Sequence, residues 1–328
     1  MHDIRLALGL IGFLSVAIFL LGRRVARMLP PRALDMAAVA LLLLMAAYLK
    51  YVWGQLWIVQ WIPLPSVIVL SNWFPLLLAA LAAVVWQRLG GEATKTTADE
   101  SDEGEAAIAS PLHSGPGLAI RRTVMMAALT GGAIWSVMYF VPTTPPECGT
   151  YWEPPYPPFP WSVCRQTNPN TCSAASSATI LVALGIPATE QEMAHLCLTR
   201  NGTTWLGLYH GLATKLIGTG YRVGFFESDI DDLPDLGSSH PLLLCCKLDA
   251  AAAEQLPEYE RDGGWIRGTA HSVVYFGQFN GRHIIGDPSR GYEAWSDRDM
   301  EILWTGQGLH ITERKPSVAV LPGRRTFD

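Results

Sequence analysis

The sequence predicts an α+β domain that follows about four transmembrane helices, and three observations support this. Apolar residues are concentrated before residue 142, and they account for the positive mean hydropathy of +0.20. Proline recurs through the next segment, and beyond it helix signals precede strand signals. This order separates a membrane region, 1–141, from a domain at 161–328, with a stalk at 142–160 between them.

The membrane region contains four apolar stretches, each near the ~20 residues that a transmembrane helix needs. They are Ile4–Leu21, Ala33–Tyr51, Val67–Trp86 and Val124–Val141. Between the last two, the segment near 90–120 is rich in small, polar and acidic residues, which predicts an acidic cytoplasmic loop. The prolines of 142–160 favour a stiff, extended stalk.

Basic residues are concentrated in the first and third loops between these spans. They are Arg23, Arg24, Arg27 and Arg32 in the first loop, and Arg88, Lys95, Arg121 and Arg122 in the third. By the positive-inside rule both loops are cytoplasmic, so we expect the domain 161–328 to be extracytoplasmic. The sequence thus predicts an integral protein of a bacterial inner or plasma membrane, with the lipid bilayer as a partner. The mild net charge of −5 gives no reason to expect nucleic-acid binding.

Helices come first in the second domain and strands follow. Capping residues and stop signals predict helices over Cys172–Leu184, Thr189–Thr199, Thr203–Gly218 and Ser296–Trp304. The expected strands are Tyr221–Phe226, Pro241–Leu248, Ser272–Phe279 and His283–Ile285. The pair Asn280-Gly281 predicts a hairpin between the last two strands, so the sheet is expected to be antiparallel.

Cys172 is a candidate nucleophile because it is placed at a helix N-terminus, behind Thr171 as a cap. The helix dipole and free N–H groups there favour the reactive thiolate. Gln166 stands six residues upstream and can donate its amide to an oxyanion, beside the Cys172 backbone N–H. The alternatives are a buried cysteine that packs like alanine and an exposed loop glutamine.

His271 opens an apolar strand and can take the thiol proton and later protonate a leaving amine. Asp287 follows sixteen residues later, and the hairpin can bring the two strand ends together. Its carboxylate can then hold the imidazole tautomer, although Asp287 can also be read as an Asp-Pro turn residue. His283 is the nearest rival histidine and is interpreted as a surface strand residue.

The segment from Gln166 to Asp287 resembles the papain-like cysteine peptidases that process double-glycine leader peptides of bacteriocins. The shared features are the upstream glutamine, the cysteine that opens a leucine-rich helix, His271-Ser-Val-Val, the turn Asp287-Pro-Ser-Arg-Gly291 and the aromatic helix ending at Trp304. The resemblance implies a papain-like fold, with Cys172 as nucleophile, His271 as base, Asp287 as orienting acid and Gln166 as oxyanion donor. Ser173 stands where this family usually has glycine.

The expected function is that of a membrane-anchored cysteine peptidase, a hydrolase that cleaves a peptide or protein substrate through an acyl-enzyme on Cys172. No cofactor or metal is required. Relatives in this family are parts of peptide exporters, so a separate transporter or a secreted peptide is an expected partner. Two alternatives stay open: another papain-like acyl transferase or amidase that uses the same residues, and a catalytically silent module that binds a peptide.

The other cysteines show no zinc-binding spacing. Cys148 and Cys164 flank part of the proline-rich segment and could be bridged in an oxidising compartment. Cys197, Cys245 and Cys246 are interpreted as small buried hydrophobic residues.

Overall fold

The computed structural model describes residues 2–99, 115–138, 147–153, 160–261 and 264–314 of the 328-residue chain. These residues form two compact units. One comprises Met1–Pro145 with Leu198–His210, and the other comprises Pro146–Cys197 with Gly211–Asp328. Parts of the expected stalk, 142–160, and of the expected acidic loop near 90–120 lie outside the described residues. The expected domain limits therefore stay a prediction.

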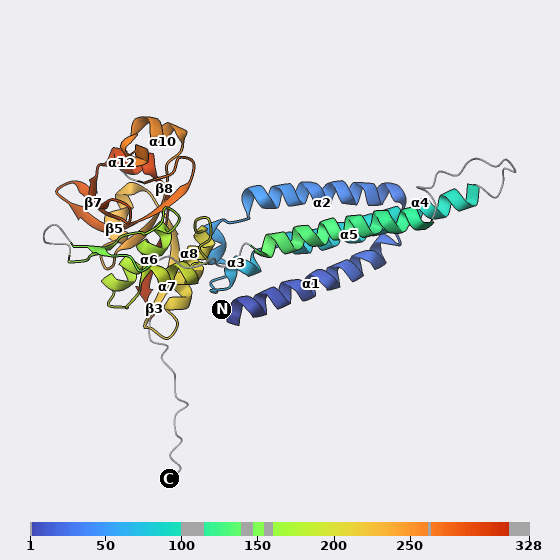
Figure 1. The fold of residues 1–328 in the computed structure, drawn as a ribbon, viewed down its shortest axis with the longest axis horizontal. Helices are drawn as coiled ribbons and strands as arrows, with labels where there is room; N and C mark the ends of the chain where they lie inside the picture. The colour runs from blue at the N-terminus through green and yellow to red at the C-terminus, as the bar shows by residue number, and fades with distance from the viewer. Residues whose placement is uncertain (1, 100–114, 139–146, 154–159, 262–263, 315–328) are drawn as a thin grey trace, which may run out of the picture. The chain divides into compact units, whose positions relative to one another are not determined.

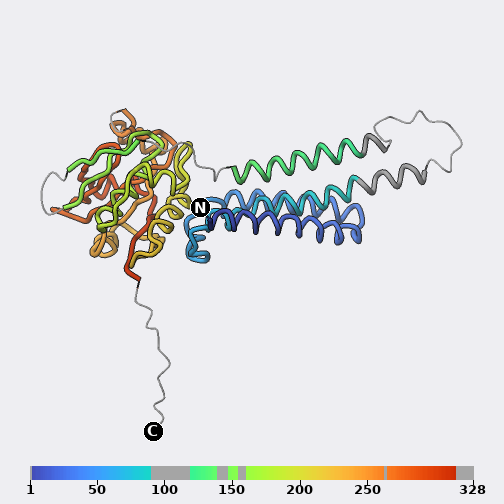
Figure 2. Tube along the Cα trace, turned by 60° about the horizontal axis from the view of Figure 1, so that its bottom comes forward, coloured from blue at the N-terminus to red at the C-terminus, as the bar shows by residue number. Residues whose placement is uncertain are grey.

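The first unit is helical. Its helices are α1 (His2–Ala26), α2 (Pro31–Tyr51), the 3-10 helix η1 (Leu56–Gln60), α3 (Val67–Leu70), α4 (Phe74–Asp99) and α5 (Gly115–Met138). Helices α1, α2 and α5 all pack against α4, and Figure 2 shows α1 and α2 running alongside it. Within the described residues, three stretches are long and apolar enough to cross a membrane: α1, α2 and Val67–Leu89. The expected fourth span, Val124–Val141, is described only as far as Met138.

Small and apolar side chains fill the space between these helices. Met45, Leu78 and Leu81 are buried there, with Leu129 packed against them. Many large apolar side chains of α1 and α2 point outward instead, among them Phe13, with 70% of its surface exposed. Helices that are apolar all round are the pattern expected of membrane spans.

The second unit is built on a six-stranded antiparallel sheet (Figure 1). Its strands are β3 (Tyr221–Glu227), β4 (Leu242–Lys247), β5 (Ala270–Phe279), β6 (Arg282–Asp287), β7 (Gly291–Trp295) and β8 (Trp304–Glu313), in the order β3-β8-β4-β5-β6-β7. The two-residue strands β1 (Tyr151–Trp152) and β2 (Val163–Cys164) form a separate pair. The α+β class and the antiparallel sheet are confirmed. Strands β7 and β8 were not predicted from the sequence.

Helices flank both faces of this sheet. On one side α6 (Cys172–Ala183) packs against β5 and against α7 (Glu190–Leu196), and α8 (Trp205–Lys215) follows in the chain. On the other side lie the short helices α9 (Leu233–Leu236), α10 (Ala250–Gln255), α11 (Glu258–Arg261) and α12 (Asp297–Leu303), with η2 (Ile230–Asp232) leading into α9. The main core lies on this second side, where Val273 and Tyr275 of β5 meet Met300 of α12 and Trp295 of β7.

The hairpin turn and one of the two helix caps named here form as the sequence predicts. Asn280 and Gly281 have φ of 50° and 72°, the positive values that a two-residue hairpin turn requires, so the predicted hairpin is present. Ser296 caps α12 through a complete capping box with Asp299. Thr171 occupies the N-cap of α6, but its side chain does not cap the helix. That prediction is wrong because a buried carboxylate accepts its hydroxyl proton.

Candidate active site

Helix α6 fixes the position of Cys172 because all but the end of the helix is buried. The ten residues from Cys172 to Leu181 are all buried, and the helix carries no charged side chain. Its hydroxyl groups are satisfied internally: Ser176 Oγ donates to the Ser272 carbonyl oxygen at 2.8 Å, and Ser177 Oγ donates to the Ser173 carbonyl oxygen at 2.7 Å. The first turn of α6 is therefore anchored to the start of β5.

Cys172, His271 and Asp287 lie together at this point. Cys172 opens α6 and is 7% exposed. Its thiol lies close enough to the His271 side chain for each group to shift the pKa of the other. The His271 Nε2 atom lies 3.0 Å from Asp287 Oδ1, which leaves Nδ1 to face the sulfur. Asp287 is the last residue of β6, one step beyond the Val274–Gly286 pair, so the hairpin brings both strand ends together.

The electrostatics of the three groups favour a thiolate–imidazolium pair. Burial acts to raise the pKa of Cys172, but the charge of His271 outweighs it and the pKa lies below that of an ordinary thiol. Burial acts to lower the pKa of His271, but Asp287 and then Cys172 raise it to about 10. Burial also acts to raise the pKa of Asp287, and His271 lowers it below its usual value. The arrangement therefore favours a negative sulfur beside a positive ring.

The Asp287 carboxylate has donors for both of its oxygens, although its side chain is fully buried. Oδ1 accepts from His271 and from the backbone N–H and hydroxyl of Ser289, both at 2.7 Å. Oδ2 accepts from the indole N–H of Trp265, also at 2.7 Å. A buried carboxylate with this many donors keeps its charge and its orientation.

Trp265 is a site residue that sequence reasoning missed. Its ring centroid lies 4.1 Å from that of His271, with the two planes tilted by 32°, and its own surface is 3% exposed. Tyr259 and Trp295 pack against its ring at 5.0 and 6.2 Å between centroids. A lone tryptophan after two glycines carries no chemical signal in the sequence, so its role emerges only from the fold.

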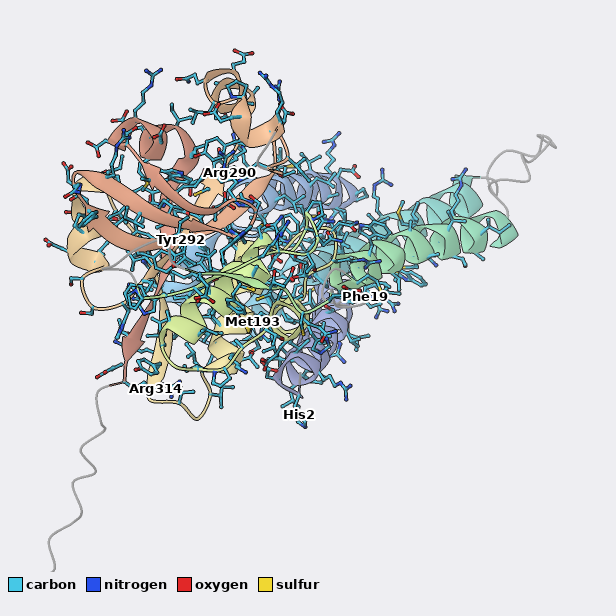
Figure 3. The ribbon with its side chains drawn as sticks, turned by 60° about the vertical axis from the view of Figure 1, so that its left-hand side comes forward. His2, Phe19, Met193, Arg290, Tyr292 and Arg314 are labelled. Atoms are coloured by element: carbon cyan, nitrogen blue, oxygen red, sulfur yellow. The ribbon has the colours of Figure 1, made fainter. Side chains whose placement is uncertain are left out.

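Behind this aromatic cluster, a half-buried carboxylate joins three donors. Glu293 of β7 accepts hydrogen bonds from Arg290, from Tyr259 Oη at 3.3 Å and from Trp295 Nε1 at 3.0 Å. Arg290 also lies over the Tyr259 ring, with 4.6 Å between its Cζ atom and the ring centroid. Figure 3 labels Arg290 and Tyr292 where the chain enters β7. The turn after Asp287 thereby supports the ring that covers His271.

Gln166 lies on the loop that leads into α6. Its backbone N–H donates to the Pro288 carbonyl oxygen at 2.8 Å, so this loop is joined to the residue after Asp287. The side chain is half-buried, and its Oε1 atom is buried without a hydrogen-bond partner in the part of the chain that the structure describes. The structure thus holds Gln166 beside the same turn as the acid.

Glu190 of α7 is a second residue that sequence reasoning missed. Its side chain is fully buried, and Oε1 accepts from the Thr167 backbone N–H at 2.8 Å and from Thr171 Oγ1 at 2.5 Å. One carboxylate oxygen therefore joins both ends of the loop between Gln166 and Cys172. In the sequence Glu190 reads only as part of the capping box behind Thr189, where an acidic residue is ordinary.

Two further expectations concern His283 and Ser173. His283 is 1% exposed, and its Nε2 lies 2.9 Å from Asp297 Oδ1, so its interpretation as a surface residue was wrong. Its strand has a buried face on which the ring packs beside Tyr275. Ser173 is buried, with its hydroxyl 2.8 Å from that of Ser272.

The structure records all six cysteines as free thiols. Cys148 is exposed and Cys164 is buried, and no disulfide joins them. Cys197, Cys245 and Cys246 are buried, as expected. Burial raises the pKa of Cys197 to about 12, so among the buried thiols it contrasts with Cys172, whose pKa is lowered.

No protein-family model and no curated protein sequence matches this chain. Solved structures that are similar to it include the peptidase domain of Streptococcus ComA, described as a bi-functional ABC transporter involved in a quorum-sensing pathway. That domain is 22% identical, with a TM-score of 0.37, and the match covers 47% of this chain and 99% of the domain. The peptidase domain of Streptococcus mutans ComA is also 22% identical, with a TM-score of 0.32, over 46% of this chain and 98% of that one.

A third similar structure is a double-glycine-motif protease from an AMS/PCAT transporter, solved with its leader peptide. It is 18% identical, with a TM-score of 0.34, over 46% of this chain and 91% of that one. These TM-scores are low, so the chemistry of the site is inferred from its geometry alone. These similar structures are two peptidase domains and one double-glycine-motif protease, the kind of protein that the sequence resembles.

Proposed function

We propose that the second unit is a cysteine peptidase that hydrolyses peptide bonds through an acyl-enzyme on Cys172. The observation that carries this proposal is that Cys172, His271 and Asp287 are buried together at the N-terminus of α6, with His271 Nε2 3.0 Å from Asp287 Oδ1. The thiol has a lowered pKa, and the imidazole has one raised to about 10. A nucleophile, its proton partner and an orienting acid are the three groups that covalent acyl transfer needs.

In the first half of the reaction, the Cys172 thiolate attacks the carbonyl carbon of the scissile bond. The imidazolium of His271 then donates its Nδ1 proton to the leaving amine as the C–N bond breaks. In the second half, neutral His271 takes a proton from water, which attacks the thioester and releases the new carboxylic acid. Asp287 keeps Nε2 protonated throughout, since its Oδ1 atom lies 3.0 Å from that nitrogen.

The oxyanion of each tetrahedral intermediate needs donors beside the sulfur. As the first residue of α6, Cys172 has a backbone N–H without an intrahelical acceptor. We assign the second donor to the side-chain amide of Gln166. This assignment is supported by the two anchors that hold its loop beside Cys172 and Asp287.

We infer that the substrate is a peptide. A protease among the similar structures was solved with a leader peptide, which favours a secreted peptide as the substrate class. The helical unit would serve as the membrane anchor, because three of its stretches are long and apolar enough to cross a bilayer. The loop arginines favour an extracytoplasmic position for residues 161–328 at a bacterial inner or plasma membrane. Protease treatment of intact cells should then degrade this domain, whereas protection would place it on the cytoplasmic side.

The reactivity of Cys172 tests the proposal without a known substrate. The full chain is treated with iodoacetamide between pH 5 and 9, and alkylation of each cysteine is followed by mass spectrometry. Cys148 is an internal control because it is an exposed, free thiol. We expect Cys172 to react faster than Cys148 at pH 6, despite its burial, and His271→Ala to abolish that advantage. A Cys172 that reacts no faster than Cys148 would favour a silent binding module.

Turnover is tested on a mixed synthetic peptide library, with and without an added primary amine. Wild-type protein should generate new free carboxyl ends, and Cys172→Ser should generate none. The Cys148→Ser variant is the matched control and should keep full activity. Products that carry the added amine would instead identify an acyl transferase.

A further inference from the structure

The helical unit contains an arginine pair that the peptidase chemistry does not use. Arg23 of α1 and Arg122 of α5 both stack on Trp86 of α4, with their Cζ atoms 5.1 and 4.9 Å from the indole ring. Arg122 Nη2 also donates to the Trp86 carbonyl oxygen at 3.3 Å. Two guanidinium groups, from two different helices, thus lie on one indole ring.

The two guanidinium groups keep unused hydrogen-bonding capacity. Arg88, close by on α4, forms an ion pair with Asp35 at 2.8 Å. Neither Arg23 nor Arg122 has a carboxylate within ion-pair distance among the residues that the structure describes. The Nε atoms of both are buried, and neither has a hydrogen-bond partner there. A buried donor without a hydrogen-bond acceptor is energetically costly, so a ligand that supplies an acceptor is favoured. Because the two donors belong to adjacent cations, an anionic acceptor is favoured most.

The helices that carry these groups are in close contact. Gly22, the neighbour of Arg23, faces Ala83 of α4 so closely that a Cβ atom on Gly22 would lie 2.9 Å from the Ala83 Cβ. Ala83 itself is fully buried. Close packing of small residues is a usual way for membrane helices to approach one another. It fixes the spacing between the Arg23 backbone and Trp86.

An apolar cavity of about 270 Å³ lies beside the arginine pair, between the same three helices. Its lining includes Phe19, Ala82 and Met126. Each of these residues is one helical turn from a member of the charged cluster: Phe19 from Arg23, Ala82 from Trp86, and Met126 from Arg122. Phe19 belongs to both, since the Arg23 Cζ atom lies 5.7 Å from its ring (Figure 3 labels Phe19 within the helical unit).

We propose that this part of the helical unit binds an anionic phospholipid, with its phosphate on Arg23 and Arg122 and an acyl chain in the cavity. Guanidinium groups bind phosphate oxygens in a planar, two-pronged geometry. Basic pockets between membrane helices bind acidic headgroups in this way. The apolar cavity next to the charges distinguishes a phospholipid from a free anion, because a phospholipid carries its phosphate next to hydrocarbon.

Native mass spectrometry of the full chain in detergent tests this proposal. The protein is titrated with short-chain phosphatidylglycerol, with phosphatidylcholine of the same chain length, and with inorganic phosphate. We expect one phosphatidylglycerol to be retained, and retained more strongly than phosphatidylcholine. Equal retention of both lipids would overturn the proposal. So would full displacement of phosphatidylglycerol by an equal concentration of inorganic phosphate, since that would identify a free-anion site.

Variants that keep the charge separate a specific site from surface attraction. The double variant Arg23→Lys, Arg122→Lys should bind phosphatidylglycerol about tenfold more weakly, because lysine cannot make the paired contact. The exposed neighbour Arg24 supplies the control, and Arg24→Lys should bind like wild type. Equal weakening in both would contradict the assignment. Size-exclusion elution and the circular dichroism spectrum establish that each variant is folded.

A second pair of variants tests the cavity. Thr130 lines the cavity and is exposed, so Thr130→Phe can fill the space without disturbing helix contacts. Thr123 is also exposed on α5 but does not line the cavity, which makes Thr123→Phe the matched control. Loss of phosphatidylglycerol in Thr130→Phe alone is the expected result. Unchanged phosphatidylglycerol binding in Thr130→Phe would show that no acyl chain occupies the cavity, which would contradict that part of the proposal.

Discussion

The indole N–H of Trp265 donates a 2.7 Å hydrogen bond to Oδ2 of Asp287, the carboxylate oxygen that His271 does not use. The same indole ring covers the His271 imidazole at 4.1 Å between centroids. The Trp265 side chain therefore orients the Asp287 carboxylate through its N–H. The face of its ring shields the contact between His271 and Asp287 from water. Excluding water from that contact strengthens the electrostatic coupling between the two groups.

Replacing Trp265 with phenylalanine separates these two effects, because Phe keeps a ring over His271 and removes the donor. A buried carboxylate oxygen left without its donor costs about 1–3 kcal/mol. We expect kcat/KM to fall about tenfold and the stability of the second unit to fall by a similar free energy. Trp304→Phe is the control, because Trp304 Nε1 donates to the Gln307 carbonyl oxygen at 2.8 Å rather than to Asp287. It should lose stability with unchanged kcat/KM, and equal activity losses in both variants would make the role of Trp265 purely structural.

Gln166→Ala should lower kcat by about 10²–10³, the usual effect of losing one oxyanion donor. The rate of Cys172 alkylation should stay unchanged, because forming a thioether with iodoacetamide creates no oxyanion. Gln191 offers a control: it is an exposed glutamine on α7, and Gln191→Ala should retain full activity. If Gln166→Ala slowed alkylation as much as peptide cleavage, Gln166 would be acting on the thiol rather than on the oxyanion.

The proximity of Cys172, His271 and Asp287 was predictable because each residue carries a local signal. A cysteine at a helix start and an Asn-Gly turn between two apolar strands are features of neighbouring residues. The hairpin then fixes the pairing of β5 with β6, and with it the approach of His271 to Asp287. Local rules of this kind predict contacts within one supersecondary unit.

Contacts between distant segments could not be predicted from the sequence in the same way. Strand β8 lies between β3 and β4, and its partners precede it in the chain by the length of several elements. Trp265 and Glu190 make their contacts with segments that lie about 20 residues away in the chain. His283 shows the limit of spacing arguments: its acid partner, Asp297, comes from the helix after β7. Hydrophobic periodicity and capping residues do not predict such contacts between distant segments.

Glu190→Ala tests whether the loop between Gln166 and Cys172 must be held at both ends. Its Oε1 atom binds Thr167 and Thr171, so its loss frees both anchors. We expect kcat to fall about tenfold through misplacement of the oxyanion donor, while Cys172 alkylation is little changed. Glu190→Gln retains an acceptor oxygen and should recover most of the activity.

The control for Glu190 is Glu192, on the same helix. Its carboxylate pairs with Lys215 at the surface, at 2.6 Å, and it does not contact the loop. Glu192→Ala should therefore leave kcat and stability nearly unchanged, because exposed ion pairs contribute little. If the two alanine variants had the same activity, the loop would not depend on the buried carboxylate.

The pH dependence of turnover should follow the thiolate–imidazolium pair. Turnover needs Cys172 deprotonated, so the acid limb should lie below the ordinary thiol pKa, in the direction in which His271 shifts it. It also needs a proton on His271, whose pKa is about 10, so activity should fall as the pH rises past that value. A bell-shaped profile of kcat/KM in the free enzyme is expected, and its two limbs belong to the coupled pair.

Asp287→Asn should narrow the pH range over which kcat/KM is high, at both its acid and its alkaline limb. The carboxylate is the largest influence that raises the pKa of His271, so without it His271 loses its proton at lower pH and the alkaline limb moves down. When the His271 imidazolium is less stable, it lowers the pKa of Cys172 by a smaller amount, so the acid limb moves to higher pH. Asp297→Asn is the matched control, since Asp297 binds His283 instead, and its limbs should coincide with those of wild type. Unchanged limbs in a folded Asp287→Asn protein would show that Asp287 does not set the charge on His271, and the proposed role of Asp287 would then fail.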